Sequence, residues 1–120
     1  MVKVFFVGNL VADPELRETG NGHLVAQARV AASTGMKDKE GEFISNFYTV
    51  SYWGVPGENF AKKAHKGDRV VVSGSLSASA VVGEKTNKAY VNLTVRADSM
   101  ERIVPTGTQT NSSSLDDELE

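Results

Sequence analysis

The fold of this chain is decided by residues 43–54, which read FISNFYTVSYWG. The stretch holds more than half of the chain's aromatic residues, and its composition and alternation predict a β-strand with two different faces. On one face Val50, Ile44 and the two tyrosines suit a core. The opposite face carries Phe47 and Trp53 between small hydroxyl residues, which is unusual for a solvated surface.

Two interpretations of that second face stay open on this stretch alone. Flat rings with free space around them are what a nucleobase needs in order to stack, and base–aromatic stacking contributes about 1–3 kcal/mol per base. Alternatively, a second subunit or a loop of the same chain covers Phe47 and Trp53.

The rest of the chain predicts four more strands and one helix. Strands are expected over residues 2–10, 23–33, 69–82 and 88–103, and a helix over residues 58–67. Five strands with a helix between the third and fourth form the plan of the OB-fold, an all-β Greek-key barrel that binds oligonucleotides over one sheet face. This agreement between pattern and chemistry places base stacking ahead of simple burial.

Local signals set the details of these elements. Residues 13–14 (Asp-Pro) should open a loop, and residues 55–57 should separate the aromatic strand from the helix. Gly67 is placed for a C-terminal helix cap. In the last strand, we expect the inward set to be Val91, Leu93, Val95 and Ala97.

Length and composition bound the class of protein. The chain has 120 residues and no cysteine, which excludes disulfides and thiolate metal sites. Its net charge is −2, but residues 106–120 carry four acids and no base, so the other 105 residues hold 13 bases against 11 acids. We therefore expect one domain over residues 1–104 and a disordered acidic tail over residues 105–120. No run of apolar residues is long enough to cross a bilayer, so a cytoplasmic protein is expected.

The first predicted strand is apolar on both faces. Val4 and Phe6 alternate with Phe5 and Val7, and a strand of this kind in a small sheet is usually covered twice. We assign Phe5 and Val7 to an interface between subunits.

Catalytic motifs are absent from the sequence. His23 and His65 have no carboxylate at metal-ligand spacing, and the serines of residues 73–79 form the outward row of one strand without a paired base. We therefore expect no enzyme, no metal and no cofactor, and a hydrolase or nuclease has no motif to support it.

Several motifs resemble the bacterial single-stranded DNA-binding proteins. They are residues 3–10 (KVFFVGNL), 13–17 (DPELR), Asn21-Gly22, Val25-Ala26, Lys66-Gly67 and residues 72–76 (VSGSL). The resemblance spans residues 2–104. It implies an OB-fold that assembles as a homotetramer, wraps single-stranded DNA and recruits other proteins through an acidic tail.

The resemblance also implies roles for single residues. Phe47 and Trp53 match base-stacking positions, whereas Met36 and Val81 stand where relatives often carry an aromatic ring, which predicts weaker binding per subunit or a shorter footprint. The full set of candidate DNA-binding residues is Phe47, Trp53, Met36, Lys37, Lys39, Lys66, Lys3, Arg17, Arg29, Val81, Lys85 and Lys88.

The chain end departs from the family pattern. Relatives usually end in aspartates followed by a short apolar tip, often Pro-Phe, but here the candidate partner-binding tail is Asp116, Asp117, Glu118, Leu119 and Glu120. The function expected overall is sequence-independent coating of single-stranded DNA in replication, repair and recombination. The alternative is a primosomal or assembly protein on the same fold that acts mainly through protein contacts.

Overall fold

The computed structural model describes residues 1–85 and 88–104. The elements in chain order are β1 (Val2–Leu10), β2 (Glu15–Glu18), β3 (Leu24–Lys37), β4 (Phe43–Trp53), α1 (Gly54–Lys63), β5 (Arg69–Val82) and β6 (Ala89–Arg102). Neighbouring strands follow the order β1-β5-β6-β4-β3-β2, and a further pairing of β1 with β3 closes the sheet into a barrel. The pairing of β4 with β6 is parallel and the others are antiparallel. The predicted all-β OB-fold barrel is confirmed.

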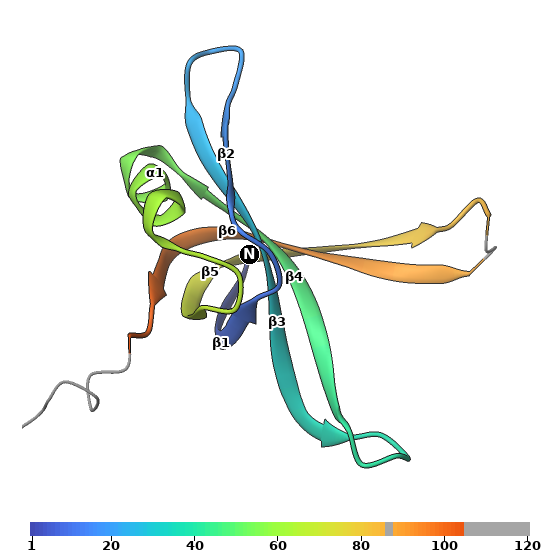
Figure 1. Ribbon diagram of the computed structural model, residues 1–120. Coiled ribbons are helices and arrows are strands. Elements are labelled where there is room, and N and C mark those ends of the chain that lie inside the picture. Colours follow the sequence, from blue (N-terminus) through green and yellow to red (C-terminus); the bar gives the residue numbers. More distant parts are fainter. Residues whose placement is uncertain (86–87, 105–120) are drawn as a thin grey trace, which may run out of the picture.

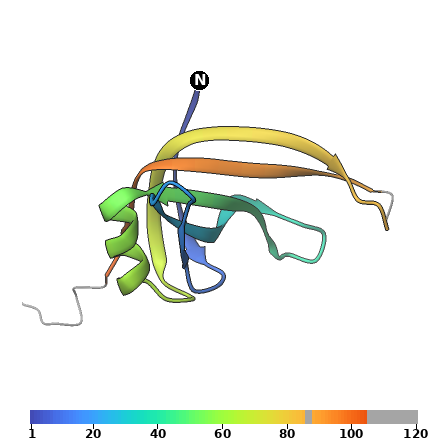
Figure 2. The ribbon, with the colours of Figure 1, turned by 90° about the horizontal axis from the view of Figure 1, so that it is seen from above.

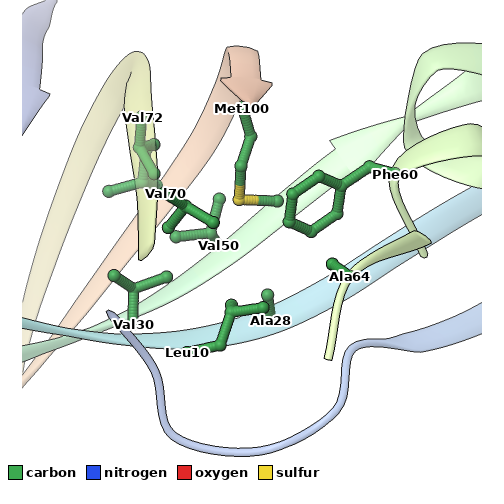
Figure 3. Packing of buried hydrophobic residues seen from close by; sticks show 10 residues of the cluster. Leu10, Ala28, Val30, Val50, Phe60, Ala64, Val70, Val72 and Met100 are labelled. Carbon is green, nitrogen blue, oxygen red and sulfur yellow. The ribbon is translucent and has the colours of Figure 1, made fainter. Parts of the chain in front are cut away.

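The hydrophobic core lies inside this barrel (Figure 3). Alternate residues of β3, β4, β5 and β6 point inward, and Val30, Val50, Val70, Val72 and Val95 are all fully buried. This confirms the predicted core face of β4. Its two tyrosines lie on the same side, because Tyr48 stacks on Phe6 and Tyr52 meets Phe60 edge to face.

Three hairpins extend beyond the barrel, formed by β2–β3, β3–β4 and β5–β6 (Figures 1 and 2). Their outer ends are not covered by any second layer of the described chain. Ile44 and Val91 lie on two of these arms and are exposed, so the prediction that they join the core is wrong. Alternation predicts which face a side chain takes, but burial requires a partner layer over that face.

The helix begins four residues earlier than predicted, at Gly54, and ends at Lys63. Pro56 is compatible with the first turn because N–H groups there have no partner within the helix. Gly57 is buried, and a Cβ at this position would overlap the carbonyl oxygen of Tyr52. The helix packs against β2, β3 and β4 and adds Phe60 to the core. It is too short and too polar to cross a membrane, and no other helix occurs in the described residues.

Two further sequence expectations fail. Gly67 does not cap the helix: Ala64 does, with its N–H donating to Phe60, whereas Gly67 adopts a φ of 91° in the next turn and donates to Leu10. The loop expected after Asp13-Pro14 contains the short strand β2, which pairs with β3. All four β2 side chains are exposed, so no apolar alternation marks the strand in the sequence.

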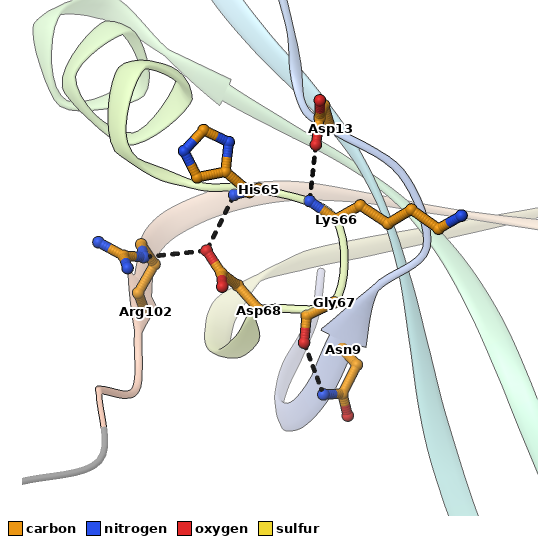
Figure 4. Close-up of polar contacts among 7 residues, drawn as sticks. All are labelled: Asn9, Asp13, His65, Lys66, Gly67, Asp68 and Arg102. Atoms are coloured by element: carbon orange, nitrogen blue, oxygen red, sulfur yellow. Dashed lines mark hydrogen bonds and ion pairs between the residues drawn. The ribbon is translucent and has the colours of Figure 1, made fainter. Parts of the chain in front are cut away.

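Polar side chains fix the segment between α1 and β5 (Figure 4). Asp68 Oδ2 accepts hydrogen bonds from the His65 N–H at 2.9 Å and from Arg102 Nε at 3.1 Å. The hydrogen bond from His65 holds the pKa of the Asp68 carboxyl below its ordinary value, partial burial opposes the shift, and the charge of Arg102 adds to it. Asp68 thereby joins the end of β6 to the segment that follows the helix.

A second pair of hydrogen bonds joins the same segment to the start of the chain. Asp13 Oδ1 accepts the Lys66 N–H at 2.7 Å, and Asn9 Nδ2 donates to the Gly67 carbonyl at 3.3 Å (Figure 4). The backbone at Lys66 is therefore held while its side chain stays exposed.

Replacing a buried methionine should show where stability resides. Met100 is buried and points toward the Phe60 ring (Figure 3), so Met100→Ala should lower the free energy of unfolding by about 2–5 kcal/mol through the cavity it leaves. The matched control Met36→Ala removes the same atoms at a side chain that is 66% exposed, and should change stability by no more than about 0.5 kcal/mol. Urea unfolding followed by circular dichroism measures both, and equal losses would contradict this core.

Asp68 should contribute to the fall of the melting temperature in acid. Because its folded pKa is lowered, its contribution to stability is present above the unfolded value near 3.8 and disappears as the pH falls through the folded value. Asp68→Asn should therefore lower the melting temperature at pH 7 and flatten its decline below pH about 4. Thermal unfolding at a series of pH values tests this, with Glu40→Gln in an exposed turn as control. An equal decline of the melting temperature with falling pH in wild type and in Asp68→Asn would refute the assignment.

Candidate nucleic-acid interface

The outward face of β4 carries the two rings singled out by the sequence. Phe47 is 47% exposed and Trp53 is 41% exposed, so neither is sealed in the barrel. Thr49 and Ser51 lie between them and are half-buried. Six residues of extended strand place the two rings about 20 Å apart along one face.

Arg29 reaches this face from the neighbouring strand β3. The register sets Arg29 opposite Thr49 and Ala31 opposite Phe47. The Arg29 guanidinium carbon lies 5.4 Å from the centroid of the Phe47 ring, which is cation–π geometry. The structure therefore places a fixed positive charge directly beside an exposed aromatic surface.

Strand β6 borders the other side of β4. Their parallel pairing places Thr94 beside Thr49 and Arg96 beside Ser51, and Arg96 is exposed. A groove of about 520 Å³ runs between the two strands and is lined by Arg29, Ser45, Asn46, Phe47, Thr49, Tyr90, Val91, Asn92 and Leu93. We call this the β4–β6 groove.

A second hollow, of about 430 Å³, lies where β4 ends. It is lined by His23, Trp53, Gly54 and Arg96, and we call it the Trp53 hollow. The groove and the hollow lie along the same outward face of β4, one at each aromatic ring.

The β3–β4 hairpin holds three more of the predicted residues. The strand predicted to end at residue 33 continues to Lys37 and so includes Met36, and Lys39 is exposed in the turn that follows. Lys37 Nζ lies 5.1 Å from the centroid of the Phe43 ring, which is itself exposed. This arm thus repeats the pairing of a cation with an aromatic ring seen at Arg29.

Other predicted residues lie at the margins. Lys3 Nζ forms an ion pair with Asp98 at 2.8 Å, and Arg17 forms one with Glu15 at 2.8 Å. Lys66 is exposed in the segment after α1. In sequence it lies 13 or more residues from every outward residue of β4, and its backbone N–H donates to Asp13.

The remaining predicted positions lie on the β5–β6 hairpin or outside the described chain. Val81 is half-buried opposite Tyr90, and Lys85 and Lys88 are exposed near the turn. The acidic tail residues Asp116, Asp117, Glu118, Leu119 and Glu120 fall outside the described residues.

The cations of the described residues differ in whether an acidic side chain pairs with them. Lys62 and Arg102, like Lys3 and Arg17, have carboxylate partners. Across residues 1–85 and 88–104, Arg29, Lys37 and Arg96 form no ion pair with an acidic side chain. These three cations therefore lie beside exposed rings without an acidic ion-pair partner in the described part of the chain. The same residues contain no group of three or more His, Asp or Glu side chains placed to hold a metal ion.

Sequence reasoning missed three residues of this face, namely Tyr90, Arg96 and Phe43. Phe43 lies four positions before Phe47 and so on the same face of the aromatic strand, which means that alternation could have identified it. Tyr90 and Arg96 occupy outward positions of the last strand, where only the inward set was considered. Their proximity to β4 depends on a parallel pairing that no local pattern encodes.

Comparison with known proteins gives a consistent result. A sequence model of the Single-strand binding protein family matches residues 1–103. A Single-stranded DNA-binding protein of Oceanobacillus iheyensis is 33% identical over 107 residues, covering 89% of this chain and 66% of that protein. Single-stranded DNA-binding protein B of Bacillus subtilis is 32% identical over 103 residues, covering 86% of this chain and 90% of that one.

Other relatives are longer than this chain, and one solved structure shares the fold. The match to Single-stranded DNA-binding protein 2 of Streptomyces coelicolor is 46% identical over 76 residues but covers only 37% of that protein. The chain thus spans just under two thirds, or less, of several curated relatives. The crystal structure of a small single-stranded DNA-binding protein from Streptomyces coelicolor superimposes with a TM-score of 0.69 at 24% identity, covering 86% of this chain and 94% of that one.

Proposed function

The chain belongs to the single-strand binding protein family, and on that premise we propose that it binds single-stranded DNA without sequence preference. One observation carries the proposal: Phe47 and Trp53 lie exposed along one strand face, with the unpaired guanidinium groups of Arg29 and Arg96 beside them.

The rings and the cations bind different parts of the DNA strand. Every base has a π-face, so stacking on Phe47 and Trp53 tolerates any sequence and contributes about 1–3 kcal/mol per base. Arg29, Lys37 and Arg96 neutralise phosphates and release condensed counterions, so affinity falls steeply as salt rises. Unpaired bases are required because a duplex hides the faces that the rings contact.

We assign the protein a coating and protecting role in replication, repair and recombination, in the cytoplasm at the nucleoid. It acts by binding and not by catalysis. The names of its relatives favour this role over the alternative of a primosomal or assembly protein that works mainly through protein contacts.

Assembly as a homotetramer belongs to the same proposal. On one side, residues 2–9 of β1 pair with β5, but only Asn9 and Leu10 of β1 pair with β3. Within the described chain, the other edge of β1 is therefore unpaired before Asn9, and such edges pair readily with a second chain. Phe5, on the outward face of β1, is 73% exposed, and Val7 lies on the same face. Contact between copies through β1 would bury both.

The acidic tail completes the proposal. Residues 116–120 offer four carboxylates and Leu119 for recruitment of replication or repair proteins.

Removing the two rings tests DNA binding. Phe47→Ala and Trp53→Ala should each weaken binding of a labelled oligo-dT by roughly 5- to 150-fold, the equivalent of about 1–3 kcal/mol. Fluorescence anisotropy at two salt concentrations measures the affinity. Ile103→Ala, an exposed aliphatic position away from the aromatic face, is the control and should bind like wild type. Absence of wild-type binding at low salt would sink the proposal, and unchanged affinity in both ring variants would favour the protein-assembly alternative.

Truncating Phe5 tests the oligomer. Wild type should sediment at about four times the chain mass of 12.9 kDa, and Phe5→Ser should shift the equilibrium toward smaller species because it removes apolar area from the contact. Sedimentation equilibrium gives both masses. A wild-type mass near 12.9 kDa would show that Phe5 and Val7 stay exposed in solution.

A further inference from the structure

We propose that a hollow between α1 and the end of β6 binds the acidic segment 114–120 of this same chain, through Leu115 and Leu119. The hollow has a volume of about 340 Å³, and we call it the α1–β6 hollow. It shares no lining residue with the β4–β6 groove or the Trp53 hollow. The inference therefore goes beyond the proposed DNA binding and concerns a second site.

One side of α1 forms a wall of this hollow. Pro56, Asn59, Phe60 and Lys63 line it, and their spacing of three, four and seven positions is that of one stripe along a helix. Other sides of α1 pack against β2, β3 and β4. Within the described residues, this stripe therefore faces open space and not a packed strand.

The end of β6 forms the opposite wall (Figures 1 and 2). Met100 and Arg102 share one face of the strand, and Val104 follows two residues later. Met100 is buried and points toward the Phe60 ring, which makes the floor of the hollow apolar (Figure 3). Val104 is 49% exposed although it is aliphatic. The hollow thus offers apolar surface to another side chain.

Two cations line the hollow and have nitrogen atoms without acceptors. The Lys63 ammonium forms no ion pair or hydrogen bond with the described residues. Arg102 donates to Asp68 through Nε, and its two terminal nitrogens have no acceptor in the described part of the chain (Figure 4). Glu101 also lines the hollow, but successive residues of a strand point to opposite faces, so its carboxylate is directed away from that of the Arg102 side. An apolar floor beside free cations fits a ligand that is both aliphatic and acidic.

The segment 114–120 of the chain has this chemistry. It reads SLDDELE, so Leu115 and Leu119 are four positions apart and four carboxylates accompany them. On a helix, residues with this spacing lie on one face, and Ser114 with Asp117 has the spacing of a helix-capping box. A helix this short is unstable alone in water, because its nucleation is costly, and it requires a surface to pack against. The two leucines would supply the side chains that pack on the floor of the hollow.

The connection is long enough for the same chain to fill the hollow. Val104 lines the hollow, and Leu115 follows eleven residues later. That length of chain spans at most about 36–40 Å. Two groups joined by so short a connection meet at an effective concentration in the millimolar range. A contact that would be weak for a separate peptide is therefore favoured within the chain.

Docking of this kind controls access to the acidic segment. With both leucines in the hollow, a protein that recognises residues 116–120 must first displace them. This consequence rests on the recruitment role proposed above, whereas the docking itself does not. DNA binding is unaffected, because the hollow and the aromatic face have no lining residue in common.

A single spin label can map the docking, because the chain has no cysteine. Ser113→Cys gives one attachment point in the full chain, next to the segment that docks. In the isotope-labelled protein, the spin label should broaden the amide signals of residues 56–63 and 100–104. The amide signals of residues 43–51, on the aromatic strand, should keep their intensity.

Variants of the labelled protein separate docking from mere proximity. Leu115→Ser with Leu119→Ser should restore most of the lost intensity in residues 56–63, because the apolar contact is gone. Lys63→Glu should restore part of it, because the carboxylates then meet a like charge. The matched control is Val55→Ser, at an exposed aliphatic residue of α1 that does not line the hollow, and it should leave the broadening unchanged. Melting temperatures like that of wild type would show that the variants remain folded.

Addition of oligo-dT distinguishes this site from the aromatic face. Saturating oligo-dT should leave the broadening of residues 56–63 in place, and Leu115→Ser with Leu119→Ser should bind oligo-dT like wild type. Broadening that oligo-dT abolishes, that lies on residues 43–51, or that persists without the leucines would overturn the hollow. Broadening of isotope-labelled chains by the spin label of other chains in a mixture would overturn the assignment to the same chain. Failure of wild type to bind oligo-dT would overturn the proposed function alone, because spectra of the free protein decide the docking.

Discussion

The structure depends on the position of β4 in the wall of the barrel, where it is hydrogen-bonded to β3 on one side and to β6 on the other. Successive side chains of a strand point to opposite faces, so those of β4 point alternately into the barrel and outward. Val50 takes the first direction and is fully buried, whereas Phe47 and Trp53 take the second and remain exposed. One strand thus contributes to the core and presents the rings. Burial of its inner face fixes the position of its outer face.

Charge contributes to the same outer face. Some cations of the described residues, such as Arg102, are matched by a nearby acid, whereas Arg29 meets the Phe47 ring and no carboxylate. A protein with a net charge of −2 can therefore present a local positive surface, since clustering and not the total decides what a phosphate encounters.

Periodic and compositional signals were sufficient for most of the fold and for the two central rings. Strand β5 has the predicted bounds because the inward residues Val70, Val72 and Gly74 alternate with Val71, Ser73 and Ser75. The helix was misplaced because Pro56 and Gly57 are turn formers by composition, and only the close approach of the Tyr52 carbonyl explains why glycine is needed there. Arg96 could not have been predicted, because its neighbour Ser51 is 45 positions away and the pairing is parallel.

Cross-strand register also bears on how strongly the face can bind. The sequence shows a shortage of rings, with Met36 and Val81 at positions where an aromatic residue was expected. In the barrel, however, Val81 lies directly opposite the exposed Tyr90, and Lys37, next to Met36, lies opposite Phe43. Tyr90 therefore presents a ring on the same face as Val81, whereas Phe43 shares the face of Lys37 and not that of Met36, because neighbouring residues of a strand point to opposite faces. One of the two positions thus gains a neighbouring ring, and the prediction of weaker binding per subunit or a shorter footprint stays a prediction.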